Sequence, residues 1–94
     1  MAVGAGCGSP APRRYEIALK NFTFEPARLS VARGDTVVFS NTDFVPHTAT
    51  ARDSTWDSKS IDGSKTWSFV PNVAGTHEYY CVFHPTMHAT IVVR

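Results

Sequence analysis

Residues 76–93, THEYYCVFHPTMHATIVV, contain two short segments typical of β-strands, with a loop between them. Residues 76–81 and 90–93 are rich in β-branched and aromatic side chains, which pack well on a pleated sheet. Between these segments, Cys81, His84 and Met87 follow one another at intervals of three residues. One tight loop can aim side chains at this spacing toward a common point. The stretch therefore predicts two strands whose connection carries candidate metal ligands.

The rest of the chain keeps the same period of two and has no long apolar stripe at helical spacing. Tyr15, Ile17 and Leu19 alternate with less apolar neighbours, and further apolar segments fall at 29–31, 36–39 and 67–69. Turn-forming sequences separate them, as at 33–35 (RGD) and 62–64 (DGS). Residues 52–60 are compatible with an irregular loop or an edge strand. Repeated short strands of this kind predict an all-β sandwich or barrel with Greek-key connections.

Length and charge limit the classes of protein. The 94 residues suffice for one domain, and a net charge of +1 gives no strong field that would attract nucleic acid or an anionic membrane. No segment is long enough to span a bilayer. Residues 1–12 contain Gly4, Gly6 and Gly8 together with two prolines, so we expect a flexible leader there and the folded domain at 13–94.

The two cysteines lie in different sequence environments. Cys7 is in the leader, whereas Cys81 is surrounded by ligand-type residues, so separate roles are favoured over a Cys7–Cys81 disulfide. Residues 5–7 (AGC) are similar to the end of a bacterial lipoprotein cleavage site, although Gly4 stands where that site usually has Leu. Cys7 is therefore a candidate lipid anchor, which would tether the protein outside the cytoplasm.

The donor types in the loop favour copper. Thiolate and thioether are soft ligands, and imidazole binds copper in both oxidation states. His47, which follows Pro46, can supply a second imidazole. Two imidazoles, one thiolate and one thioether are the ligands of the type 1, or blue-copper, electron-transfer site. Taken singly, each of these residues is more often structural, but their joint spacing favours the ligand interpretation. Zinc is the alternative metal, although Met is a poor zinc ligand.

Several motifs are similar to those of cupredoxins, the type 1 blue copper proteins, of the plastocyanin/amicyanin group. They are residues 34–37 (GDTV), Pro46-His47, 79–81 (YYC) and the final strand at 91–93. The similarity covers residues 15–94, and the short gap between His84 and Met87 resembles that of amicyanin. The resemblance implies a Greek-key β-sandwich of about seven or eight strands. It also implies a single copper ion held by His47, Cys81, His84 and Met87.

Two residues depart from the usual cupredoxin pattern. In many relatives an Asn after the first ligand His joins the two ligand loops. Thr48 stands there in this chain, and its hydroxyl can substitute. Pro85 follows the second His and has no N–H to donate to the Cys81 sulfur. His77 and His88 are predicted to lie outside the site, because His77 is about 13 Å along a strand from Cys81 and alternation turns His88 away.

The resemblance implies a monomeric, periplasmic or extracytoplasmic carrier of single electrons between redox protein partners, and not an enzyme. Phe44, Pro46, Phe83, His84 and Pro85 form the predicted docking patch, and whether the two Phe rings face solvent or cover the metal is open. A copper chaperone is an alternative, but such proteins favour Met-rich sites and this chain has two methionines. A small enzyme using Cys81 and a His is another, but no orienting acid is evident.

Overall fold

Residues 11–94 are described by a computed structural model, and within them the chain forms eight strands. In chain order the strands are β1 (Arg14–Lys20), β2 (Thr23–Glu25), β3 (Arg28–Val31), β4 (Thr36–Asn41), β5 (Thr50–Ala51), β6 (Thr66–Phe69), β7 (Gly75–Cys81) and β8 (His84–Val93). Residues 11–94 include no helix with the length and hydrophobicity that a membrane crossing needs.

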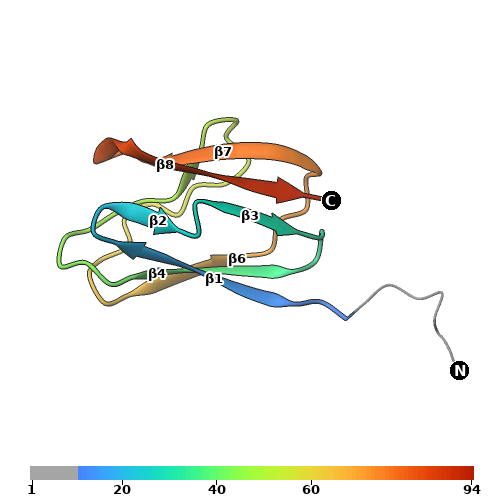
Figure 1. The fold of residues 1–94 in the computed structure, drawn as a ribbon, viewed down its shortest axis with the longest axis horizontal. Coiled ribbons are helices and arrows are strands. Elements are labelled where there is room, and N and C mark those ends of the chain that lie inside the picture. Colours follow the sequence, from blue (N-terminus) through green and yellow to red (C-terminus); the bar gives the residue numbers. More distant parts are fainter. Residues whose placement is uncertain (1–10) are drawn as a thin grey trace, which may run out of the picture.

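The strands form two four-stranded sheets that pack face to face (Figure 1). One sheet has the order β2-β1-β4-β6 and the other the order β3-β8-β7-β5. β1 pairs with β4 and β3 with β8 in parallel, whereas the remaining pairs are antiparallel. Consecutive strands such as β2 and β3, and then β3 and β4, lie in different sheets, so the chain crosses from one sheet to the other, as in Greek-key sandwiches. The predicted all-β sandwich is confirmed.

The core forms where the inward positions of the two sheets meet. Ile17 and Leu19 in β1 have no solvent exposure, as their alternation predicted. Phe39 in β4 is also fully buried and contacts four aromatic rings, those of Phe24, Trp67, Phe69 and Tyr79. This aromatic cluster joins both sheets and supplies much of the apolar area that a small domain can bury.

Several segments differ from or refine the sequence prediction. β2 and β5 were not predicted, because segments of three and two residues are too short to show a periodic pattern. β8 begins at His84, whereas the sequence predicted a loop up to residue 89. Residues 52–60 are mostly irregular and contact β5 through an isolated bridge between Thr50 and Asp57. β1 starts one residue after the predicted domain start at 13. Most of the predicted leader, including Cys7, lies outside the described residues, so that boundary stays a prediction.

The two ends of the sandwich have different features. The β1–β2 and β7–β8 turns lie together at the end opposite the C-terminus (Figure 1). The other end contains the turn before β4, where Gly34 has a φ of 95°, a conformation that favours glycine. Asp35 closes this turn, since its carboxylate accepts hydrogen bonds from the backbone N–H groups of Arg13 and Ala32, each at 2.8 Å.

Asp35→Asn should lower the stability of the fold in a pH-dependent manner. The two backbone hydrogen bonds hold the pKa of Asp35 below its ordinary value of 3.8. A lowered carboxyl pKa contributes stability above the unfolded-state value, and this contribution is lost as the pH falls through the folded-state value. We expect the mutant to unfold at a lower temperature than the wild type at pH 7, and the gap to narrow below pH 3.8. A gap that stays constant into acid would contradict this.

Candidate metal centre

The four predicted ligands come from two neighbouring parts of the fold. Cys81 is the last residue of β7 and pairs with His84, the first residue of β8, across a two-residue turn. The register then shifts, because Tyr80 already pairs with His88. Residues 85–87 therefore bulge from the ladder, and this bulge contains Met87. His47 lies between β4 and β5, where it forms an isolated bridge with Ile61.

The side chains of Cys81 and His47 place their ligand atoms next to each other. The sulfur of Cys81 lies 3.6 Å from Nδ1 of His47, and both side chains are fully buried. A metal bound to sulfur at about 2.3 Å and to nitrogen at about 2.0 Å, at a tetrahedral angle, would hold these atoms about 3.5 Å apart. The backbone N–H of Thr48 also donates to the same sulfur at 3.3 Å. The spacing and the donor types fit a shared metal ion.

His84 and Met87 do not complete a preformed site with this pair. The His84 ring is 5.3 Å from the His47 ring, centroid to centroid, and Met87 is buried in the same core cluster as Cys81. Within residues 11–94, no group of three or more His, Cys, Asp and Glu side chains is arranged to hold a metal ion as it stands. The ligand roles of all four residues therefore stay a proposal.

Thr48 joins the two ligand-bearing loops. Its hydroxyl accepts a hydrogen bond of 2.9 Å from the backbone N–H of Val82, in the β7–β8 turn. The Thr50 hydroxyl donates to the same oxygen at 3.0 Å. The prediction that the Thr48 hydroxyl substitutes for the usual Asn is confirmed. His47 and Cys81 are held in register because the residue that follows each of them takes part in this bond.

Thr48→Val should loosen this connection. Valine keeps the shape of threonine but cannot accept from Val82, and the loss of such a hydrogen bond costs about 1 kcal/mol. We expect the free energy of unfolding of the metal-free protein to fall by about that amount. Thr86→Val, in the bulge of β8, is the matched control, since the Thr86 side chain is exposed and makes no hydrogen bond within residues 11–94. Equal losses in both variants, measured by urea unfolding, would argue against the role of Thr48.

Asp43 and Phe22 are neighbours of the site that the sequence analysis missed. Oδ2 of Asp43 lies 2.8 Å from Nε2 of His47, on the side of the ring away from Cys81. The Phe22 ring packs edge-on against both His47 and His84, with centroids 5.2 and 4.7 Å away. Burial raises the pKa of Asp43, but hydrogen bonds from the Phe22 N–H, His47 and the Asn21 N–H outweigh it and lower the pKa overall.

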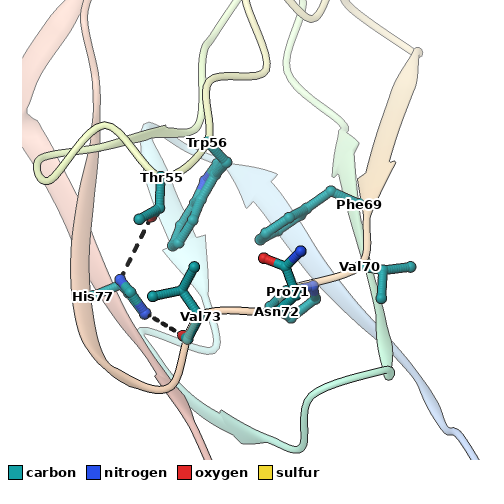
Figure 2. A pocket seen from close by; sticks show the side chains of 8 residues that line it. All are labelled: Thr55, Trp56, Phe69, Val70, Pro71, Asn72, Val73 and His77. Carbon is teal, nitrogen blue, oxygen red and sulfur yellow. Dashed lines mark hydrogen bonds between the residues drawn. The ribbon is translucent and has the colours of Figure 1, made fainter.

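His77 and His88 lie outside the centre, as predicted. His77 is buried and contacts Asp53 through Nδ1 and the Val73 carbonyl through Nε2, at 2.7 Å in the second case. Figure 2 shows it beside Trp56 at the edge of a small pocket of about 40 Å³, far below the size of a ligand site. His88 is exposed on β8. The contacts of His77 and the exposure of His88 therefore both agree with positions outside the candidate centre.

Cys81 is a free, buried thiol. Cys7, the other cysteine and the candidate lipid anchor, lies outside the described residues. The buried position of Cys81 against His47 favours a role within the site over a role in a surface disulfide.

The apolar side chains of the predicted docking patch are exposed at the protein surface. Phe44 is fully exposed and the Phe83 side chain is 49% exposed, so neither ring packs inward over the site. Pro46 and Pro85 are also exposed, and His84 is half-buried between them and the core. Phe22, which was not part of the predicted patch, adds a second half-exposed ring. All five residues of the predicted docking patch, called the apolar patch below (Phe44, Pro46, Phe83, His84 and Pro85), thus have accessible surface.

The fold and the candidate centre define a class, that of small β-sandwich proteins with a Cys and two His side chains gathered at one end. The sequence profile of the Cupredoxin-like domain family matches residues 7–93, and the chain belongs to this family. Within it the chain is a cupredoxin of the amicyanin group. Amicyanin-alpha from Methylorubrum extorquens (strain ATCC 14718 / DSM 1338 / JCM 2805 / NCIMB 9133 / AM1) is 26% identical over 84 residues, which cover 84% of this chain and 71% of the relative.

Solved structures agree with this assignment. A purple cupredoxin from Nitrosopumilus maritimus has a TM-score of 0.78 and 25% identity, covering 84% of this chain and 98% of that chain. The oxidized state of an amicyanin mutant has the same TM-score and identity and covers 80% of that chain. A Cu(I) form of another amicyanin mutant is 23% identical, with a TM-score of 0.79 over 93% of this chain and 86% of that chain, and shares the fold.

Proposed function

We propose that the protein is a type 1 copper electron carrier that binds one copper ion through His47, Cys81, His84 and Met87. The contact between the buried Cys81 sulfur and Nδ1 of His47, at 3.6 Å, is the observation that carries the proposal. Membership of the cupredoxin-like family and the Cu(I) amicyanin of the same fold support copper as the ion. Two imidazoles, a thiolate and a thioether are the donor set of this class of site.

When bound, copper supplies a single-electron couple between Cu(I) and Cu(II). The protein residues determine where the metal would be bound and what surrounds it. Full burial of Cys81 and His47 excludes water from the donors on the core side. The Thr48 N–H stabilises negative charge on the sulfur, while Pro85 has no N–H to add a second donor from its own position. His84 is half-buried, so one donor lies near the protein surface.

The alternatives agree less well with these residues. An enzyme that used Cys81 as a nucleophile would need the thiol to meet a substrate, but this sulfur has no solvent exposure. A copper chaperone needs exposed donors that exchange metal readily, whereas three of the four proposed donors are buried. We therefore propose a carrier that keeps its metal and is not an enzyme. Zinc agrees less well because thioether is a poor zinc ligand.

A redox titration of the copper-loaded protein tests this function. A carrier should follow the Nernst relation for one electron, and its visible band should bleach on reduction and return on oxidation over repeated cycles. The metal should stay bound to the protein in the presence of a competing copper chelator through these cycles. Loss of copper to the chelator at each reduction would favour the chaperone instead.

The partners proposed for this carrier are redox proteins that dock at the apolar patch. The patch includes His84, the proposed copper ligand that is closest to solvent. A net charge of +1 provides little long-range electrostatic steering. Small interfaces of this kind suit brief encounters of a monomer. A periplasmic or other extracytoplasmic location, with Cys7 as candidate lipid anchor, completes the proposal.

Phe83→Ser should slow electron self-exchange between two copies of the protein. Burying half of an aromatic side chain contributes about 1 kcal/mol, so we expect the rate to fall about fivefold to tenfold. Salt should change the wild-type rate little because the net charge is small. The rate can be measured from NMR line broadening in mixtures of oxidised and reduced protein. Val70→Ser, an exposed site at the other end of the sandwich, is the control and should leave the rate unchanged.

A further inference from the structure

The structure contains two buried histidines that are each paired with an aspartate. His47 pairs with Asp43 beside the candidate metal centre, and His77 pairs with Asp53 away from it. Each aspartate precedes its pair partner in the chain and contacts one ring nitrogen. The two pairs therefore offer a comparison within one protein between a carboxylate that contacts a proposed ligand and one that does not.

The contact with Asp43 determines which nitrogen of His47 carries the proton. An ionised carboxylate only accepts hydrogen bonds, so the 2.8 Å contact requires Nε2 of His47 to donate. In the neutral ring the other nitrogen, Nδ1, then has a free lone pair. Nδ1 is the atom that faces the Cys81 sulfur at 3.6 Å. The contact with Asp43 thus leaves the lone pair that could bind a metal on Nδ1, the nitrogen that faces Cys81.

Asp43 is itself held in place by the backbone. Its two oxygens accept from the N–H groups of Asn21 and Phe22 at 2.8 and 3.0 Å. These two residues have φ values of 52° and 61° and form the two-residue turn between β1 and β2, a geometry in which both N–H groups can point to one side. The Asp43 N–H also donates to Oδ1 of Asn41 at 2.9 Å. The carboxylate therefore has little freedom to leave His47.

We infer that Asp43 is a positioning residue that holds His47 in the tautomer whose Nδ1 is free to bind copper. The same carboxylate fixes the turn that carries Phe22 against the His47 and His84 rings. Second-sphere partners of this kind orient a ligand ring and raise its basicity. The effect on copper binding rests on the proposed function, whereas the tautomer is a property of the metal-free protein.

The ring nitrogens of His47 in the metal-free protein test the inference directly. We expect ¹⁵N NMR of the wild type, at a pH where the ring is neutral, to show a protonated Nε2 and an unprotonated Nδ1. Asp43→Ala should produce a mixture of the two tautomers and weaken copper binding about 10- to 100-fold. Asp43→Asn keeps the shape and one of the two acceptor oxygens, so it should give a smaller change in the same direction.

Asp53→Ala is the matched control, because it removes the partner of His77 without touching the proposed ligands. It should leave the His47 tautomer and the copper affinity unchanged. A wild-type ring already protonated at Nδ1, or unchanged tautomer and affinity in both Asp43 variants, would overturn the inference. A wild type that binds no copper would instead refute the proposed function, and the tautomer measurement would still decide whether Asp43 orients His47.

Discussion

Cys81→Ser should abolish the intense visible absorption of the copper-loaded protein. In the proposed site this band arises from charge transfer between the thiolate and copper, and a serine hydroxyl does not ionise at neutral pH to replace it. Cys81 is the single described cysteine, and its sulfur contacts His47 directly. We expect the band to disappear while the fold is retained. Visible absorption and circular dichroism of the variant after addition of copper measure the two properties.

His77→Ala and His88→Ala are the controls for this experiment. His77 is buried in a separate contact with Asp53, and His88 is exposed on β8. Both variants should keep the band. Survival of the band in Cys81→Ser, or its loss in His88→Ala, would show that the metal is bound elsewhere.

Among the substitutions proposed for this protein, Phe39→Ala should cause the largest loss in the free energy of unfolding. Phe39 is fully buried and contacts aromatic rings from both sheets, including Phe24 and Tyr79. Truncating a buried Phe costs about 3–5 kcal/mol, a large part of the total for a small domain. For a chain of this size each 1 kcal/mol lowers the melting temperature by about 4–8 °C. We therefore expect a drop of more than about 12 °C in the metal-free protein.

Phe44→Ala is the matched control for Phe39→Ala, because it removes the same side chain from a fully exposed position. Its melting temperature should stay within about 2 °C of the wild type, since exposed substitutions change stability little. Similar losses in the two variants would contradict the assignment of the core to the aromatic cluster around Phe39.

Most of the strands could be predicted because their burial follows a period of two. Ile17 and Leu19 face the core as their alternation indicates, and the same rule located β4 and β7. β2 and β5 escaped the prediction because segments of three and two residues, each with one buried side chain, show no period. The irregular course of residues 52–60 depends on tertiary contacts, such as the burial of Trp56, that local sequence does not encode.

The candidate ligands could be predicted from donor types and spacing, whereas their surroundings could not. His47 was found from its position after Pro46, and its contact with Cys81 confirms that the two loops meet. Asp43 lies four residues from His47, but nothing in that spacing shows that its carboxylate would turn toward the ring. Phe22 reaches the site through a turn formed by two residues with positive φ, a conformation that is common for Asn21 but rare for a bulky residue such as Phe22.

Titration of the metal-free protein with copper(II), followed by visible absorption, tests the central claim most directly. A single type 1 site should give an intense band that grows linearly and stops at one equivalent of copper per chain, because Cys81 supplies one thiolate to one site. Equimolar zinc, added afterwards, should leave the band intact. No visible band at one equivalent, or growth that continues to two, would contradict the assignment of a single type 1 copper site to His47, Cys81, His84 and Met87.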